Sequence, residues 1–493
     1  MSNIRAAQKD AEHPRVAALG DRIRGLEAVF SCEGSAILTS PVELLFPGGT
    51  RVRVERESRF LGKDIGKKLM KRCEPAPFGV GKETHRDRRV RDGGQLLARD
   101  GALRVNGLDL VTTGILAEVH RALCPGDDQA PEAELYALNV YDERGHFVRH
   151  KDTPRDVEVF GTLVVCLPVP FLGGRLMLHH ESTRAYDWGT SSAYYRSRDQ
   201  AADHRVRWAA FYGDVDHEIE RVRSGTRVTL TWLLRRGTRG KVAVNAPVAS
   251  EDDLTRALAE AIADPTFVPL GGLLGIPTLH LYAATPGLAR PAEAMSAATA
   301  ERLKGRDRLV ARAVARAGLQ PRYRPYIFED CANEAWRLSR EPSDGETAIF
   351  DGSQLSGDEL EEELPIERHV DHYDGDDVTW LVPPPWTKSC PSDAEPAQAL
   401  LGELEYSGTG YFGNEGSDAA FYSAAALLFD VPTASERHLQ HLAPPSATVT
   451  KGKVAKGKVA KGKVTKGKVT KAKVTKAKAK AKEGGNSRRA AQR

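Results

Sequence analysis

The stretch ELYALNVYDERGHFVRHKD, residues 134–152, decides the fold class. Residues 134–141 and 147–150 are rich in Val, Leu, Tyr and Phe, and a turn-forming run at residues 142–145 separates them. Both runs are therefore expected to be β-strands. Further strand-like runs follow with no helical pattern between them, at residues 157–169, 175–179, 207–212 and 227–234. Closely spaced strands of this kind predict an antiparallel sandwich or barrel and not a doubly wound sheet.

Charge is divided unequally along the chain. The 493 residues hold 71 Lys plus Arg against 67 Asp plus Glu, a net charge of +4. Residues 451–493 alone hold 14 Lys and 3 Arg against a single acid, Glu483, so this segment carries +16 and residues 1–450 carry −12. This division excludes a uniformly basic nucleic-acid binder.

The basic segment repeats a five-residue unit, Lys-Gly-Lys-Val-Ala, from Lys451 onward. Such a tract cannot bury a hydrophobic core and is expected to be disordered. Its closely spaced lysines, with no interleaved aromatic residues, suit the neutralisation of phosphates but offer no stacking on bases. Non-specific binding to DNA, RNA or polyphosphate is the functional interpretation, and a solubilising extension is the alternative.

Cysteine usage and hydropathy predict the compartment. The six cysteines lie far apart with no Cys-x-x-Cys pair, which argues against a zinc ribbon or a dense disulfide framework. Residues 1–15 are polar and lack the apolar run of a signal peptide, and nowhere do about 18 apolar residues stand together. We expect a cytoplasmic protein with reduced thiols and no membrane partner.

Four residues have the spacing of a metal site with a nearby cation. Alternation along an extended segment places His150 and Asp152 on one face, so both can reach one metal ion. His217 follows 65 residues after Asp152, and Arg227 lies ten residues further on. Two histidines and one carboxylate form the facial triad that leaves three positions open on Fe(II).

This four-part pattern resembles the Fe(II)/2-oxoglutarate-dependent dioxygenases, in particular their prolyl 4-hydroxylase-like branch, over residues 135–235. Tyr141 precedes the His-x-Asp segment as in that branch, Gly173-Gly174 precedes a strand, and residues 223–227 resemble its closing turn. That branch often has Lys where this chain has Arg227, and both residues supply a cation.

The resemblance implies a double-stranded β-helix, or jelly roll, that holds Fe(II) through His150, Asp152 and His217. It further implies that Arg227 binds the far carboxylate of 2-oxoglutarate, with Tyr141 and Thr229 as added contacts. Reaction with O2 would then give succinate and CO2 and hydroxylate a C–H bond, with ascorbate in support. The substrate is unidentified, and a protein side chain such as prolyl is the candidate.

The expected chain organisation has four parts. Residues 1–20 are a flexible N-terminus, and residues 21–240 are the dioxygenase domain with helical and strand support ahead of its core, residues 134–235. Residues 241–442 are an α+β domain of unknown role, and residues 443–493 are the disordered Lys-rich tail. Helices are expected in four places, from about Leu19 to Leu26 and at residues 108–123, 252–262 and 306–317.

Other histidines have competing interpretations. A second His-x-Asp occurs at His369 and Asp371, with His438 as a later partner, but it lies in an acidic run and Thr448, not a cation, stands ten residues beyond His438. A solvated loop is the favoured interpretation there. We expect His146 in a loop, and His179 to have a packing or surface role with substrate contact as the alternative.

The competing function is a non-enzymatic polyanion-binding or scaffold protein, in which a metal-free β-sandwich carries the cationic tail. The oligomeric state is left open by the sequence.

Overall fold

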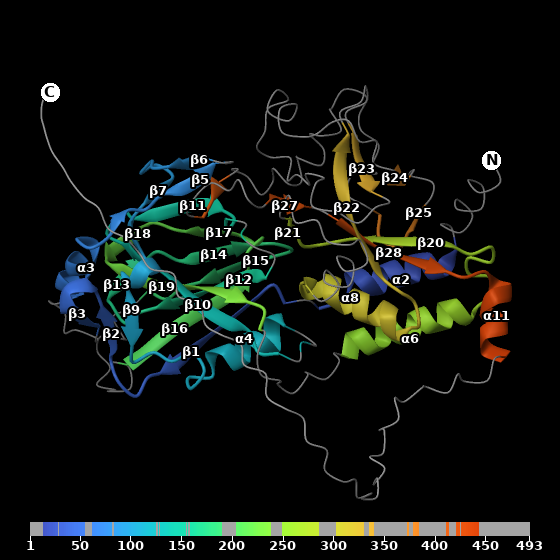
Figure 1. Ribbon diagram of the computed structural model, residues 1–493, viewed down its shortest axis with the longest axis horizontal. Helices are drawn as coiled ribbons and strands as arrows, with labels where there is room; N and C mark the ends of the chain where they lie inside the picture. Colours follow the sequence, from blue (N-terminus) through green and yellow to red (C-terminus); the bar gives the residue numbers. More distant parts are fainter. Residues whose placement is uncertain are drawn as a thin grey trace, which may run out of the picture. The chain divides into compact units, whose positions relative to one another are not determined.

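The middle of the chain forms a seven-stranded antiparallel sheet in the computed structural model (Figure 1). Its order is β1-β16-β12-β19-β10-β8-β4. The four central strands are β16 (Arg205–Tyr212), β12 (Val159–Cys166), β19 (Arg227–Arg235) and β10 (Glu132–Tyr141), and they are flanked by β1 (Ser31–Ile37), β8 (Gly94–Leu97) and β4 (Glu74–Pro75). Register aligns apolar residues across strands, as in Leu138 opposite Leu230 and Leu163 opposite Trp232.

A five-stranded antiparallel sheet, in the order β15-β14-β17-β11-β7, contains the early strand β7 and four strands that come between those central strands in the chain. It contains β15 (Thr183–Tyr186), β14 (Leu176–His179), β17 (Asp216–Ile219), β11 (His146–His150) and β7 (Arg91–Asp92). The chain therefore alternates between sheets, from β10 to β11, β12 to β14, and β16 to β17 to β19. The inward side chains of both sheets share one hydrophobic core, which includes Leu163 and Leu230 of the larger sheet and Leu178 of the smaller.

Smaller elements complete this sheet lobe, the name used here for the two sheets and what packs on their shared core. They are β2 (Val42–Leu45), β3 (Arg51–Val54), α3 (Gly62–Met70), β5 (Phe78–Val80), β6 (Glu83–His85), β9 (Arg104–Asn106), α4 (Ile115–Leu123), β13 (Phe171–Gly173), β18 (Val222–Gly225) and the distant strand β26 (Tyr411–Phe412), with short 3-10 turns at Pro47–Gly49 and Arg99–Gly101.

A second hydrophobic core lies among helices and a six-stranded sheet, here called the second lobe. The helices α2 (Pro14–Arg24) and α8 (Gly305–Arg316) both pack on α6 (Ala249–Ala263). The sheet order is β24-β23-β22-β28-β20-β25. Among the described strands of this sheet, only β20 and β25 pair in parallel. Its strands are β20 (Gly272–Pro277), β22 (Arg322–Glu329), β23 (Ala335–Ser339), β24 (His372–Tyr373), β25 (Val378–Trp380) and β28 (Ala425–Val431), and β21 (Tyr282–Ala284), β27 (Phe421–Ser423) and α11 (Ala434–Leu442) accompany them.

The structure describes residues 13–27, 29–54, 62–80, 83–124, 127, 129–153, 155, 158–189, 204–237, 249–284, 302–329, 335–339, 372–373, 378–383, 411–413, 421–423 and 425–442. The Lys-rich segment, the second His-x-Asp and the nearby Asp374, Asp376 and Asp377 lie outside these residues. No helix among the described residues is long and apolar enough to cross a membrane. The four cysteines that are described, Cys32, Cys73, Cys124 and Cys166, are free thiols.

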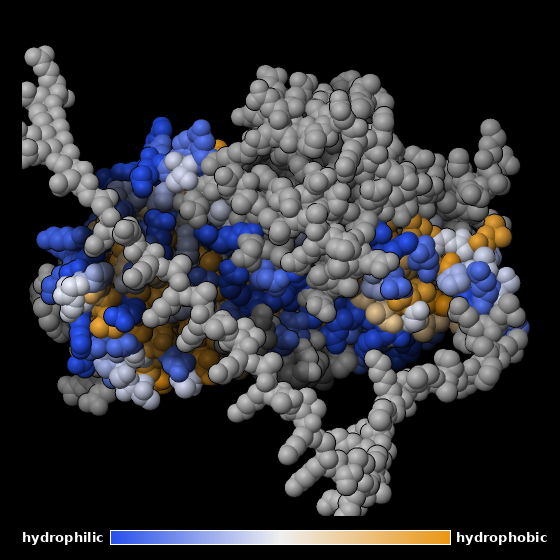
Figure 2. Space-filling view, in the orientation of Figure 1, coloured by the Kyte–Doolittle hydropathy of each residue, from blue (hydrophilic) through white to orange (hydrophobic). Residues whose placement is uncertain are grey.

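The chain through Leu442 is one compact unit, and both lobes belong to it. Figure 2 shows hydrophobic side chains reaching this face in two areas, one over the sheet lobe and one beside the second-lobe strands, with a hydrophilic band between them. The domain boundary at residue 240 stays a prediction.

Two expected helices have different limits in the structure. The first begins at Pro14, inside the segment expected to be flexible, because Val16, Leu19 and Ile23 bury one face of the helix in the second lobe. The expected helix at residues 108–123 begins only at Ile115. Ahead of it, the Asp109 carboxylate accepts from the Val111 N–H and the Asp109 carbonyl accepts from the Thr113 N–H, and these bonds form a turn.

Candidate functional site

The structure pairs the two candidate metal-binding histidines across neighbouring strands. His150 ends β11 and lies directly opposite His217 of β17. Both side chains are buried, and their ring centroids are 4.1 Å apart. The sequence placed these residues 67 positions apart, and the alternation of the chain between the two sheets brings them together.

Backbone carbonyls fix the tautomer of both imidazoles. His150 Nδ1 lies 2.8 Å from the Val148 carbonyl oxygen, and His217 Nδ1 lies 2.9 Å from the Val215 carbonyl oxygen. Because a carbonyl only accepts, each Nδ1 carries the proton and donates it. A ring held in this way presents its Nε2 lone pair to a metal ion when the ring is neutral, which is the arrangement in which histidine ligands are usually held.

The environment of His150 favours this neutral form. Burial holds the pKa of His150 well below its ordinary value, and the neighbouring His217 lowers it further. A neutral imidazole is the form that binds metals. His150 can therefore bind a metal ion without first losing a proton.

A β-bulge sets the local direction of these side chains. Phe147 pairs with Ile219 and His150 pairs with His217, so three steps on β11 match two steps on β17. Phe147 and His150 consequently stack with ring centroids 3.5 Å apart, although simple alternation would place them on opposite faces.

Asp152 follows β11 and reaches the same place. Its backbone N–H donates to the Gly213 carbonyl at 3.1 Å, and its Oδ2 accepts from the Thr162 hydroxyl at 2.6 Å. Its Oδ1 is 3.8 Å from His217 Nε2. Two ligands at right angles and about 2.1 Å from one ion would be roughly 3 Å apart, so a shift of about 1 Å would bring these two atoms to ligand spacing.

Among the described residues, no three His, Cys, Asp or Glu side chains already stand as a formed metal shell. Of the predicted trio, the ring centroids of His150 and His217 lie 4.1 Å apart and Asp152 Oδ1 lies 3.8 Å from His217 Nε2, while Asp152 Oδ2 accepts from Thr162. Both imidazoles nonetheless present the donor atom that a metal needs, so the residues fit the ion that the pattern implies.

Arg227 is a buried cationic side chain in the sheet lobe. It starts β19 opposite Tyr141 and is only 1% exposed. Its Nε and Nη2 are buried and have no hydrogen-bond partner among the residues that the structure describes. Its guanidinium carbon lies 5.6 Å from the centre of the Trp188 ring and 5.9 Å from that of Tyr141. A buried guanidinium with two unpaired N–H donors costs free energy. An anion that accepts hydrogen bonds from both donors would offset this cost.

Burial lowers the pKa of Arg227 from its ordinary value, while Cys166 and Tyr141 act in the opposite direction. Desolvation is therefore the main cost at this position, and a bound carboxylate would offset it.

The other two predicted cosubstrate contacts lie beside this arginine. Tyr141 is buried at the end of β10. Thr229 is buried on the same strand as Arg227, two residues on, opposite Asn139. Residues two apart on a strand share a face, so Arg227 and Thr229 can contact one ligand.

Sequence reasoning missed several residues around the site. Arg91 lies with its guanidinium carbon 4.4 Å from the centre of the Phe147 ring and donates to Asn139 Oδ1 at 3.0 Å. It also donates to the carbonyl of Gly413 at 2.7 Å. A methyl group built on Gly413 would lie 3.4 Å from Asp152 Oδ1, so this distant glycine closes against the candidate ligand.

Gly413 reaches the site through strand pairing. It follows β26, which pairs antiparallel with β5 at Tyr411 opposite Val80 and Phe412 opposite Gly79. The contact spans 322 residues from Arg91, and no local pattern in residues 411–413 signals it.

Three histidines that the sequence singled out lie outside the candidate metal site. His146 was expected in a loop, and this is wrong, because it is the first residue of β11 and its ring contacts the carbonyls of Arg144 and Arg89. His179 contacts Glu218 and Thr183. His438 is exposed on α11.

No family model matches the chain, and no curated protein matches it. Among solved structures, a prolyl-4-hydroxylase from Pseudomonas putida aligns over 46% of this chain and 100% of its own, with 15% identity and a TM-score of 0.24. A Trichoplax adhaerens prolyl hydroxylase in complex with a hypoxia inducible factor oxygen degradation domain peptide fragment aligns over 46% and 91%, with 14% identity and a TM-score of 0.24. A 2OG-Fe(II) oxygenase family oxidoreductase from Burkholderia pseudomallei aligns over 47% and 96%, with 11% identity and a TM-score of 0.22.

Proposed function

We propose that this protein is an Fe(II)- and 2-oxoglutarate-dependent dioxygenase, and that its two alternating sheets form a double-stranded β-helix. The observation that carries the proposal is Arg227, which is buried with two open donors in the sheet opposite the paired imidazoles of His150 and His217. A buried cation that can bind a carboxylate and two imidazoles that can bind a metal ion suit one reaction class.

The residues have separate tasks. His150, His217 and Asp152 would hold Fe(II), and the iron with O2 and 2-oxoglutarate would supply the oxidising chemistry that ends in succinate, CO2 and a hydroxylated substrate. Arg227 would bind the far carboxylate of 2-oxoglutarate through two parallel N–H donors. Burial of these groups excludes water and keeps the ion pair strong.

The substrate class rests on the sequence resemblance alone, and a protein side chain such as prolyl is the candidate. Ascorbate is expected to support turnover by keeping iron reduced.

Succinate formation tests the proposal. Purified full-length protein with Fe(II), ascorbate and 2-oxoglutarate should release succinate slowly without added substrate, and His217→Ala should release none above buffer. Succinate release that is equal in the wild type and in His217→Ala, or absent from both, contradicts the proposal.

A further inference from the structure

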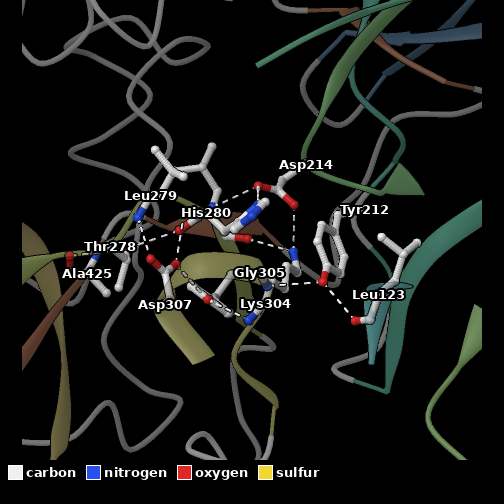
Figure 3. A network of polar contacts seen from close by, with 12 residues as sticks. Leu123, Tyr212, Asp214, Thr278, Leu279, His280, Lys304, Gly305, Asp307 and Ala425 are labelled. Carbon is white, nitrogen blue, oxygen red and sulfur yellow. Dashed lines mark hydrogen bonds and ion pairs between the residues drawn. The ribbon is translucent and has the colours of Figure 1, made fainter. Parts of the chain in front are cut away.

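A buried polar network joins the second lobe to the turn that precedes His217 (Figure 3). Asp214 lies in this turn, residues 213–215, between β16 and β17, and is almost fully buried. Its Oδ1 accepts from Lys304 Nζ at 2.8 Å. Its Oδ2 accepts from His280 Nδ1 at 2.9 Å and from the Leu281 backbone N–H at 3.0 Å.

The second lobe holds these three donors rigidly. Lys304 directly precedes α8, and His280 and Leu281 lie in the loop between β20 and β21. Asp307, in the first turn of α8, accepts from the His280 backbone N–H at 3.0 Å and from the Tyr282 hydroxyl at 2.8 Å. The loop and the helix start are therefore fixed to each other as well as to Asp214.

A glycine permits the close approach of these parts. Gly305 has a φ of 41°, and a Cβ on it would lie 2.8 Å from His280 Nε2. Its N–H donates to the Tyr212 hydroxyl at 3.0 Å, and Tyr212 ends β16, the strand that leads into the turn. The second lobe thus binds the turn at Asp214 and at the strand end before it.

The two carbonyls beside Asp214 contact both sides of the candidate metal site. The Gly213 carbonyl accepts from the Asp152 backbone N–H at 3.1 Å. The Val215 carbonyl accepts from His217 Nδ1 at 2.9 Å. Any movement of the turn would therefore move the backbone of one ligand and rotate the imidazole of another.

The charge of Asp214 is maintained despite its burial. Burial raises the pKa of Asp214, but Lys304 and His280 outweigh it and hold this pKa well below its usual range. Buried ion pairs are rarely more stabilising than apolar residues of the same volume, whereas they do fix geometry. The ion pairs of Asp214 beside the turn 213–215 are thus better explained by positioning than by stability.

We propose that Asp214 is a positioning residue, and that Lys304, His280 and the Leu281 amide hold it so that the turn 213–215 orients Asp152 and His217 for metal binding. This inference rests on the proposed metal site. It gives the second lobe, whose role the sequence leaves open, a defined task in the reaction.

Metal binding by the full-length protein tests this inference without requiring turnover. Mn(II) affinity would be measured from the EPR signal of the free ion, and the ligand field from the visible absorption of the Co(II) complex. Lys304→Met should raise the Kd for Mn(II) by about ten- to a hundredfold and change the Co(II) spectrum. Lys304→Arg, which keeps the cation, should regain most of the affinity.

Arg312→Met is the matched control. It removes a cation that pairs with buried Glu251 inside the second lobe, 3.2 Å away, and leaves the turn untouched. Its thermal unfolding midpoint should fall, while Mn(II) affinity and the Co(II) spectrum should stay at wild-type values. Should Lys304→Met fail to fold, the double variant Asp214→Asn with Lys304→Met, which removes both charges together, replaces it and should also bind Mn(II) more weakly.

The outcomes separate the two claims. A folded Lys304→Met or double variant with wild-type Mn(II) affinity and an unchanged Co(II) spectrum overturns the positioning role and leaves the proposed function standing. Wild-type protein that binds Mn(II) no better than His217→Ala overturns both.

Discussion

At the scale of single residues, the proposed function depends on the unpaired N–H donors of the buried Arg227. Most buried polar atoms in proteins have a hydrogen-bond partner, but Arg227 Nε and Nη2 have none in the described part of the chain. The sequence could predict Arg227 as a cation at the correct spacing. It could not predict that the side chain is buried beside the rings of Tyr141 and Trp188, because Tyr141 lies on β10 and Trp188 follows β15.

Substitution of this arginine should act on the cosubstrate and spare the metal. Arg227→Ala should raise the 2-oxoglutarate concentration needed for half-maximal succinate release by about a hundredfold or more, since one partner of a buried ion pair costs about 3 to 5 kcal/mol. Mn(II) affinity should stay unchanged. Arg235→Ala, on the same strand but paired with Glu134 near the surface, is the control and should leave the requirement as it is. An unchanged requirement in Arg227→Ala would assign the carboxylate to another cation.

The stability of the folded chain should depend on pH through His180. Its ring stacks on His280 with centroids 4.6 Å apart, and burial, aided by His280, lowers the pKa of His180 to about 3. Between pH 6.5 and about 3, His180 is therefore protonated in the unfolded chain and neutral in the folded chain. The contribution of His180 to the unfolding free energy is fully present above pH 6.5 and decreases as the pH falls toward 3.

Denaturant unfolding at pH 7 and pH 5 measures this effect. From His180 alone the wild type should lose about 2 kcal/mol between the two values, since one pKa unit corresponds to about 1.4 kcal/mol. The unfolding free energy of His180→Phe should fall by about 2 kcal/mol less over the same pH change. The other buried histidines should contribute equally to the pH dependence of both proteins. Equal losses in the two proteins would show that His180 titrates normally.

At the scale of elements, alternation of strands between the two sheets builds the site. Strand positions were predicted well where apolar runs are long, as for β10, β12, β16 and β19. The bulge in β11 was not predicted, because it depends on the pairing of Phe147 with Ile219 and His150 with His217, two contacts across strands. Strand β26 was missed for the same reason, since its partner β5 lies more than 300 residues earlier.

Strand β12 should contribute to metal binding through Thr162, whose hydroxyl donates to Asp152 Oδ2 at 2.6 Å. Thr162→Val keeps the shape and removes the donor, so Mn(II) affinity should fall by about tenfold with little change in the thermal midpoint. Thr231→Val on β19, whose hydroxyl contacts Asn139 instead, is the matched control. A wild-type affinity in Thr162→Val would show that Asp152 is oriented by its backbone alone.

At the scale of the whole molecule, charge and chemistry reside in different parts. The described candidate site is complete by Thr229, apart from the contact with Gly413, and the +16 of residues 451–493 stands apart from the −12 of the rest. The sequence predicts this division directly. The sequence does not predict the link from the second lobe to the turn 213–215, because Asp214 and Lys304 are 90 residues apart and neither belongs to a motif.

Deletion of residues 449–493 should therefore separate two properties. Succinate release and Mn(II) affinity should stay at wild-type values, because these residues supply no predicted ligand. Binding to DNA, RNA or polyphosphate should be lost, and in the intact protein it should weaken steeply with salt as counterions are released. Salt-insensitive binding by the truncated protein would place the recognition surface on the remaining chain.

The central claim is that one site binds both a metal ion and 2-oxoglutarate, and a crystal structure of the full-length protein with Mn(II) and 2-oxoglutarate tests it most directly. Anomalous diffraction at the manganese edge should give one strong peak bonded to His150, Asp152 and His217, with the far carboxylate of 2-oxoglutarate on Arg227. A peak at His369 and Asp371, or a 2-oxoglutarate molecule that leaves the Arg227 guanidinium without an anion, would contradict the account.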